Sequence, residues 1–284
     1  MTMNVEAKFV LQRRFGWRYI IMLFCVLMAA GAAFFCQQPK PLQATMVADS
    51  ENGTKVLVLN YHKIDHTFIS LAVRPEDFDN QMKYLRDNGY HTISPDELYE
   101  ALAGNKTLPE NPVMITFDDG YEDNYTNAYP ILKKYGFKAT IFVVTGFLDK
   151  HKKGYLSWDQ AREMNKNGIN IESHTVNHRS MTDLTDDELR AELVDSKKKA
   201  EAELGHEVNY IAYPTGTYNL HIAQMVKEAG YKAAFTIKYG NVDKASNIYA
   251  LERVPIFHTE ETNKDFVERV RYQPIFESFG WMKN

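Results

Sequence analysis

From residue 55 onward, short apolar runs alternate with longer stretches that carry apolar residues on one helical face. The runs are rich in β-branched and aromatic residues, which is typical of buried strands. Strands are therefore predicted at residues 56–61, 113–117, 139–144, 170–173 and 211–213.

The stretches between these strands predict helices. Phe78, Met82 and Leu85 share one face of a helix that ends at Gly89. Residues 94–97, Ser-Pro-Asp-Glu, have the form of a capping box with proline in the first helical turn. Further helices are predicted around residues 127–135, from residue 157 onward, and at 185–204 and 221–229. This alternation predicts one α/β domain, a distorted and incomplete (β/α) barrel.

Two adjacent carboxylates, Asp118 and Asp119, follow the predicted strand 113–117 and precede Gly120. In α/β barrels the chemistry lies at the C-terminal ends of the strands, so this position suits a site. Neighbouring side chains on extended backbone point in different directions, which would let one aspartate bind a cation while the other acts as a base. An isolated Asp-Asp-Gly sequence also occurs as a solvated turn.

A second cluster follows the predicted strand 170–173, where His174 and His178 have the spacing His-x-x-x-His. Neutral imidazoles are the most common ligands of zinc and similar ions. With one aspartate they would form a two-histidine, one-carboxylate face. The alternative interpretation is a pair of surface histidines in a polar loop. A third strand, 211–213, runs into a loop punctuated by Pro214 and Gly216.

These three motifs, residues 116–120 (Thr-Phe-Asp-Asp-Gly), 173–178 (Ser-His-Thr-x-x-His) and 212–216 (Ala-Tyr-Pro-x-Gly), together resemble polysaccharide deacetylases of the NodB-homology type, carbohydrate esterase family 4. The resemblance spans about residues 55–255 and is greatest to the branch that deacetylates poly-N-acetylglucosamine of biofilms. It implies a NodB-type barrel and hydrolysis of acetamide groups.

The resemblance also implies roles for individual residues. Asp118 corresponds to the general base. Asp119, His174 and His178 correspond to the ligands of a divalent metal ion, with zinc expected first and cobalt or nickel as alternatives. A divalent ion polarises the acetamide carbonyl while a carboxylate takes a proton from the attacking water, so the roles agree with the chemistry.

The loop after strand 211–213 is expected to stabilise the negative charge that builds on the carbonyl oxygen. Tyr213 and a backbone N–H in the loop up to Gly216 are the candidates for this substrate and oxyanion contact. Tyr213 is a candidate by its position in the motif, and a tyrosine at the end of a strand is also often a packing residue.

Two departures from the family pattern affect the expected site. Members commonly have an arginine at the start of the Tyr-Pro motif, where it holds the base, but residues 210–212 are Tyr-Ile-Ala here. Arg253 is the nearest replacement. The general acid, which protonates the leaving amine, is expected to be His62, because it ends an apolar strand and the biofilm branch takes this group from an early strand. His258 is the alternative acid.

Composition fits an ordinary globular enzyme. With 44% apolar and 25% charged residues among 284, the chain can bury one core of about 230 residues. The net charge of -4 does not indicate a protein that binds nucleic acid. Both cysteines, Cys25 and Cys36, lie near the N-terminus, so the expected catalytic domain has no disulfide and no thiolate ligand.

The N-terminal region predicts a membrane segment. Residues 19–36 lack charged side chains and follow a basic region, 1–18, that is expected to be cytoplasmic. Eighteen helical residues span about 27 Å, close to the hydrocarbon thickness of a bilayer. Small residues at 29–33 leave a cleaved signal peptide, and hence secretion, as the alternative. Residues 37–54 are predicted to be a linker, and 55–284 the deacetylase domain.

The sequence therefore predicts a membrane-anchored enzyme with its catalytic domain outside the cytoplasm. Its expected substrate is an acetylated glucosamine polymer, most directly poly-N-acetylglucosamine. A peptidoglycan or chitooligosaccharide deacetylase is the first alternative, and a non-catalytic carbohydrate-binding surface protein is the second. No obligate protein partner is evident from the sequence.

Overall fold

The computed structural model describes residues 55–271, which belong to one compact unit. The predicted membrane segment 19–36, the linker up to residue 54 and the end of the chain after Arg271 lie outside the described residues. None of the helices between residues 55 and 271 has the length and apolar character that a bilayer crossing requires.

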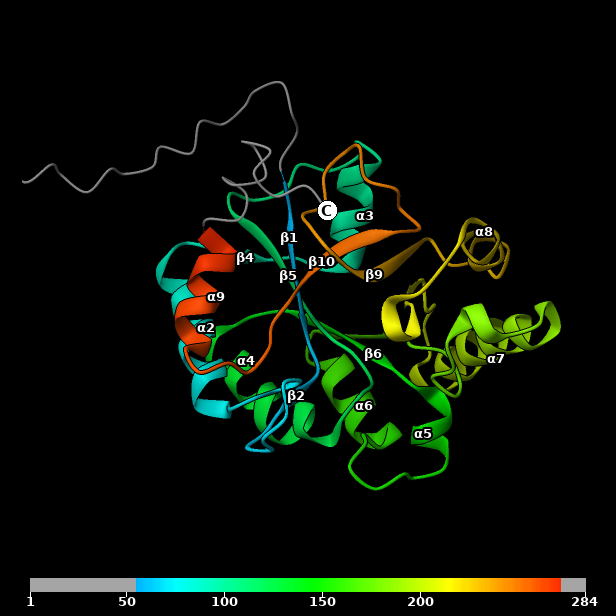
Figure 1. The fold of residues 1–284 in the computed structure, drawn as a ribbon, viewed down its shortest axis with the longest axis horizontal. Coiled ribbons are helices and arrows are strands. Elements are labelled where there is room, and N and C mark those ends of the chain that lie inside the picture. Colours follow the sequence, from blue (N-terminus) through cyan, green and yellow to red (C-terminus); the bar gives the residue numbers. More distant parts are fainter. Residues whose placement is uncertain (1–54, 272–284) are drawn as a thin grey trace, which may run out of the picture. The chain divides into compact units, whose positions relative to one another are not determined.

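Within residues 55–271, seven parallel strands close into a barrel (Figure 1). The barrel closes because β1 pairs with β5 on one side and with β10 on the other. In chain order the strands are β1 (Leu57–Tyr61), β5 (Pro112–Phe117), β6 (Ala139–Val143), β7 (Ile169–Ser173), β8 (Tyr210–Ala212), β9 (Ala233–Tyr239) and β10 (Leu251–Pro255). The predicted (β/α) barrel is confirmed, and a register shift between β9 and β10 contributes to its distortion.

Three short strands lie outside the barrel ring. β4 (His91–Thr92) pairs with the beginning of β5, and β2 (Lys63–Ile64) pairs with β3 (Ala72–Val73) in a separate two-stranded sheet. β2 follows β1 directly, so the chain leaves the barrel at His62.

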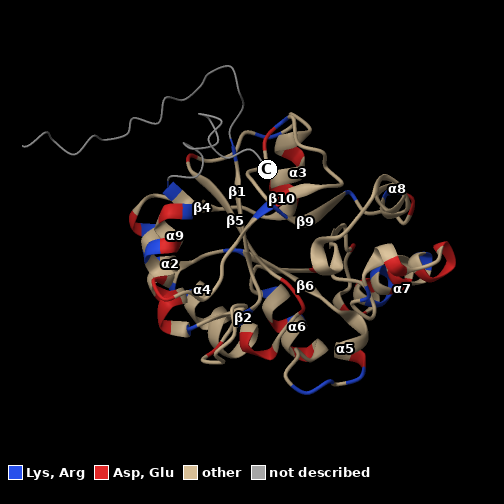
Figure 2. Cartoon of the chain, viewed as in Figure 1, with Lys and Arg blue, Asp and Glu red and all other residues tan. Residues whose placement is uncertain are grey.

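Helices cover the outside of the barrel (Figure 1). Capping boxes open three of them, at Ser94, Ser157 and Thr185, and each satisfies backbone N–H groups of the first turn. The α-helices are α2 (Pro75–Asp87), α3 (Pro95–Leu102), α4 (Tyr129–Tyr135), α5 (Thr145–Asp149), α6 (Trp158–Lys166), α7 (Asp186–Leu204), α8 (Leu220–Glu228) and α9 (Thr262–Arg271). Basic and acidic residues are mixed over these helices (Figure 2).

The helix predicted at residues 127–135 is different from the expectation. The chain forms a π-helix, η1 (Asn124–Ala128), before α4 begins at Tyr129. Pro130 lies in the first turn of α4, where a proline without an N–H is tolerated. The wider turn of η1 begins at Asn124, a few residues after the Asp-Asp-Gly loop.

Alternate residues of the strands pack into two separate clusters. Leu57, Leu59 and Tyr61 belong to the larger cluster, which also holds the buried faces of the helices. The smaller cluster lies inside the barrel, since Phe142 of β6 contacts Phe235 of the non-adjacent β9, with 5.4 Å between ring centroids. The period of two therefore directs one set of side chains into the barrel, where the polar site residues also lie.

Candidate active site

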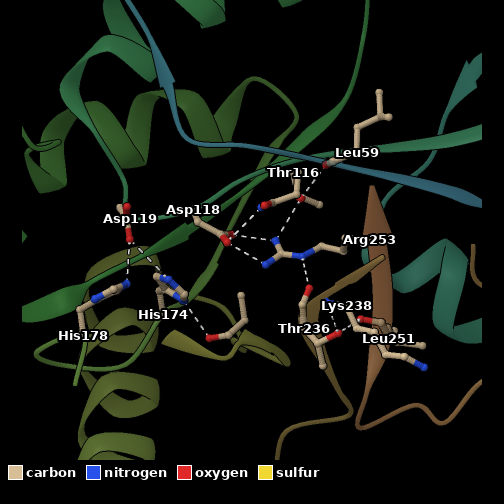
Figure 3. A network of polar contacts seen from close by, with 12 residues as sticks. Leu59, Thr116, Asp118, Asp119, His174, His178, Thr236, Lys238, Leu251 and Arg253 are labelled. Atoms are coloured by element: carbon tan, nitrogen blue, oxygen red, sulfur yellow. Dashed lines mark hydrogen bonds and ion pairs between the residues drawn. The ribbon is translucent and has the colours of Figure 1, made fainter. Parts of the chain in front are cut away.

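The C-terminal ends of β1, β5, β7 and β8 carry most of the residues predicted for the site. Figure 3 shows that Asp118, Asp119, His174, His178 and Arg253 form one polar network. The parallel strands explain this convergence, because their C-terminal ends meet at one end of the barrel.

Asp118 and Arg253 form a buried, bidentate ion pair. The two guanidinium Nη atoms of Arg253 donate to Oδ1 and Oδ2 of Asp118 at 2.8 and 2.7 Å. The side chains are 0% and 3% exposed. Arg253 also donates through Nε to the backbone oxygen of Thr236 and through Nη1 to Thr116. Arg253, the expected replacement for the arginine missing at residues 210–212, therefore contacts Asp118.

This pairing sets the charge of Asp118. Burial alone would raise the pKa of its carboxyl, but the Arg253 charge and other nearby cationic groups lower the pKa to about 2. Asn60 of β1 adds a third hydrogen bond, from Nδ2 to Oδ2, at 3.0 Å. Asp118 is therefore ionised at neutral pH and held at both oxygen atoms.

Asp119, His174 and His178 form a second group beside Asp118. Their potential ligand atoms all lie within 4.8 Å of one another. Nε2 of His178 lies 3.1 Å from Oδ1 of Asp119, and Nε2 of His174 lies 3.4 Å from the same oxygen. One carboxylate and two imidazoles are a donor set that suits zinc and similar divalent ions.

The structure also fixes which nitrogen of His174 faces this group. Nδ1 of His174 donates to the backbone oxygen of Ala212 at 2.8 Å, so Nε2 is the nitrogen that faces Asp119. Burial alone would lower the pKa of His174, but the hydrogen bond to Asp119 and the charges of both aspartates raise it. A carboxylate that attracts a proton at this nitrogen would attract a metal ion there as well.

The loops that carry these residues adopt strained backbone. Asp119, Thr175, His178 and Thr215 have positive φ values of 71°, 66°, 57° and 58°. A non-glycine residue in this region costs on the order of 1–3 kcal/mol, and such residues cluster at functional sites. Gly120 also has a positive φ of 70°, and a Cβ there would lie 3.0 Å from Cγ1 of Val143. The Asp-Asp-Gly turn is thus tightly constrained.

The two histidines considered for the general acid lie in different surroundings. The charges of Asp118, Asp119, Arg253 and His174 all act on the ring of His62, although burial is the largest influence and lowers its pKa. His258 instead packs against the ring of Phe68, with centroids 5.7 Å apart, and lies 3.4 Å from Oγ1 of Thr262.

Tyr213 is buried and its hydroxyl donates to the backbone oxygen of Tyr249 at 2.9 Å. Its own N–H donates to Phe235, and the N–H of Gly216 donates back to the oxygen of Tyr213. The hydroxyl and N–H of Tyr213 and the N–H of Gly216, which were expected to contact the substrate, therefore already donate hydrogen bonds within the protein. Position 216 requires glycine, because its φ is 72° and a Cβ there would clash with Cγ1 of Ile237.

Comparison with known proteins identifies the family. Residues 105–234 match the family described as polysaccharide deacetylase. YxkH of Bacillus subtilis (strain 168), which is named as a polysaccharide deacetylase, is 41% identical over 207 residues, 73% of each chain. The chain belongs to the polysaccharide deacetylase family.

Two further proteins are similar to this deacetylase. A poly-beta-1,6-N-acetyl-D-glucosamine N-deacetylase of Staphylococcus aureus (strain MRSA252) is 30% identical over 228 residues, covering 70% of this chain and 78% of its own. It is thus a more distant relative than YxkH. The structure of the Streptococcus pyogenes deacetylase PplD in complex with acetate matches with a TM-score of 0.73 and 33% identity. The match covers 77% of this chain and 99% of PplD.

Sequence reasoning missed two polar residues of the deacetylase site, Asn60 and Thr116. Both are buried, and they contact Asp118 and Arg253 respectively. Each is a polar residue inside an otherwise apolar strand, two positions before His62 and Asp118. This spacing of two residues was the available signal, because residues i and i+2 of a strand point to the same face.

Two aromatic residues near the motifs, Trp158 and Tyr121, have different surroundings. Trp158 is buried and its Nε1 donates to Asp149 at 2.8 Å, which explains it by packing. Tyr121 stacks on Tyr155 with centroids 5.0 Å apart, and the Asp119 charge, after burial, raises the pKa of its hydroxyl. Tyr121 thus lies next to the candidate metal site.

The buried ion pair makes a prediction about stability. Arg253→Ala is expected to lower the free energy of unfolding by about 3–5 kcal/mol at neutral pH, because Asp118 stays buried without its cation. In the wild type, the Asp118 contribution is present above its ordinary pKa of 3.8 and is lost as the pH falls toward about 2. The difference between the two proteins should therefore shrink over that acid range.

Urea denaturation at several pH values would measure this difference. Arg179→Ala is the matched control, because Arg179 forms an exposed pair with Glu188 and should cost about 0–1 kcal/mol. Equal losses for the two variants at neutral pH would contradict the role given to the buried pair.

Proposed function

We propose that this deacetylase hydrolyses acetamide groups on N-acetylglucosamine units of an extracellular or cell-wall polysaccharide in a metal-dependent reaction. Poly-N-acetylglucosamine is the proposed substrate, and the named activity of the 30% identical relative supports it. The observation that carries the proposal is the arrangement of the Arg253–Asp118 pair directly beside the Asp119, His174 and His178 group.

Asp119, His174 and His178 would hold the divalent ion, for which zinc is proposed first and cobalt or nickel next. The donor set and the Ala212 contact that presents Nε2 of His174 support this assignment. When bound, the ion would supply a Lewis acid that polarises the acetamide carbonyl.

Asp118 would act as the general base. Arg253 keeps its carboxylate ionised and fixes its orientation, so it can accept a proton from the attacking water. The same pairing makes Asp118 a weaker base. The fixed position of its carboxylate offsets part of that loss, because an oriented group reacts faster. The contact of Arg253 with Asp118 also favours turnover over the alternative of a non-catalytic carbohydrate-binding protein, because an arginine holds the expected base.

His62 would act as the general acid that protonates the leaving glucosamine nitrogen. The proton that Asp118 gains balances the proton that His62 gives, so the cycle needs no further reagent. The charges of both aspartates favour the protonated ring that this role requires, whereas burial lowers the pKa of His62. The ring of His258 instead contacts Phe68 and Thr262.

Acetate release from defined glycans tests the function. Poly-N-acetylglucosamine, chitin oligomers and peptidoglycan should be compared, with chelation and metal add-back for each. We expect the fastest release from poly-N-acetylglucosamine, loss of release after chelation, and recovery with added metal. His178→Ala is the control with a damaged metal site. Release that survives chelation with no metal bound would contradict the metal-dependent reaction, and a preference for peptidoglycan would transfer the proposal to that substrate.

Two alanine variants separate the candidate acids. His62→Ala should retain its metal and lose about 10²-fold to 10⁴-fold in turnover, because only the protonation step is removed. His258→Ala should change turnover by no more than about 2-fold, since its side chain contacts Phe68 and Thr262. Kinetics on one oligomer, with metal content measured, would check both. Near-normal turnover of His62→Ala beside a severe defect in His258→Ala would move the acid to residue 258.

We also propose that residues 19–36 anchor the deacetylase in the cell membrane with residues 55–284 outside. The uncharged run and the basic residues before it support this localisation. Cell fractionation and N-terminal sequencing should find the intact N-terminus in the membrane fraction. A free, shortened chain outside the cell would mean secretion after cleavage.

A further inference from the structure

His62 lies in a segment that the barrel itself does not hold. β1 ends at Tyr61, whose backbone oxygen accepts a hydrogen bond from the N–H of Asp118. The two residues after His62, Lys63 and Ile64, form β2, whose strand partner within residues 55–271 is the two-residue strand β3. So short a ladder gives little restraint to the backbone that carries the proposed acid.

Side chains of η1 and of the residue before it bind this segment instead. Nδ2 of Asn124 donates to the backbone oxygen of His62 at 2.8 Å. Oδ1 of Asp123 accepts from the N–H of Ile64 at 2.7 Å, and Nδ2 of Asn127 donates to the oxygen of Ile64 at 2.7 Å. We call Asp123, Asn124 and Asn127 the η1 clamp.

The η1 clamp is itself braced. The amide of Asn124 also donates to Oδ1 of Asp123 at 3.1 Å, and Nζ of Lys63 lies 2.7 Å from Oδ2 of the same carboxylate. Asn124 is 1% exposed and Asp123 is 8% exposed. Hydrogen bonds at such buried positions are costly to break, because each partner left behind loses its contact without regaining water.

The side chain of His62 has no comparable tether. Its Nδ1 atom is buried and has no hydrogen-bond partner among residues 55–271. In many sites a carboxylate or a backbone oxygen on one ring nitrogen fixes the orientation of the histidine. Here the position of the ring depends on the position of its backbone, and the η1 clamp holds that backbone.

The π-helix agrees with a functional role for the clamp. Its i→i+5 geometry is rare, and single π-turns occur frequently at functional sites. η1 follows the Asp-Asp-Gly turn within a few residues, so one loop carries both aspartates and the clamp. The base, one metal ligand and the support of the acid are therefore set by a single segment.

We propose that Asn124, braced by Asp123 and assisted by Asn127, is a positioning residue for His62 in the deacetylation reaction. This inference rests on the proposed role of His62 as the general acid. Asn124 contacts no reacting atom and acts by fixing where the imidazole meets the leaving nitrogen.

A double-mutant cycle tests the proposal. Asn124→Ala should lower kcat on an N-acetylglucosamine oligomer by about 10-fold to 100-fold, with KM and metal content nearly unchanged, since a displaced catalytic group loses rate rather than binding. In a His62→Ala background the same change should cost less than about 2-fold, because the group that it positions is already absent. Asn127→Ala provides a second, milder variant should Asn124→Ala fold poorly.

A change of leaving group separates positioning from general damage. Nitrophenyl acetate releases an anion that needs no proton from an acid, so its hydrolysis should suffer much less than acetamide hydrolysis in Asn124→Ala. Asn167→Ala is the matched control: this exposed asparagine also donates through Nδ2 to a backbone oxygen, that of Glu163, and should change neither substrate.

The possible outcomes distinguish the inference from the function beneath it. Fully additive losses in the double variant, or equal losses on the amide and the ester, would overturn the positioning role while leaving the deacetylase activity intact. A wild-type chain that releases no acetate from any of the glycans would overturn the proposed function, and the role of Asn124 with it.

Discussion

The ion pair between Arg253 and Asp118 is the interaction on which the rest of the site depends. It joins β10 to the end of β5 across β1, the strand that closes the barrel. An ionised pair inside a protein is expensive unless its remaining donors and acceptors are satisfied. Asn60, Thr116 and the backbone of Thr236 satisfy them here, so the pair is held by four strands.

This arrangement gives two neighbouring aspartates different properties. Asp118 faces a permanent cation and stays ionised, whereas Asp119 faces two imidazole nitrogens that can hold a metal ion. Figure 3 shows the two side chains directed at these different partners, and Asp119 has a positive φ of 71°. The two carboxylates therefore lie in separate environments, which their separate roles require.

The loop after β5 connects the parts of the site. It carries Asp118 and Asp119, turns at Gly120, and continues into the η1 clamp around His62. Its backbone is also bonded to residues 154–156, through Glu122 and Gly154 and through Leu156 and Gly120. A change in this loop would therefore be felt by the base, the metal site and the proposed acid together.

Much of the barrel and of the site was available from the sequence. Short apolar runs rich in β-branched and aromatic residues located five of the seven barrel strands, and β9 and β10 were not predicted. The polar residues directly after the predicted strands marked the end of the barrel that carries the chemistry. The capping box at Ser94 could be recognised because it depends on residues three positions apart. The spacing of His174 and His178 was also local information.

Contacts between distant segments could be decided only by the tertiary structure. Arg253 reaches Asp118 over 135 residues, and Asn124 reaches His62 over 62. No local pattern encodes these distances, since they depend on the order in which the strands close the barrel. The sequence by itself determined which residues could do the chemistry and at which end of the strands they lie. The fold decided which of them meet, because burial in the closed barrel makes each charge and polar group find its partner there.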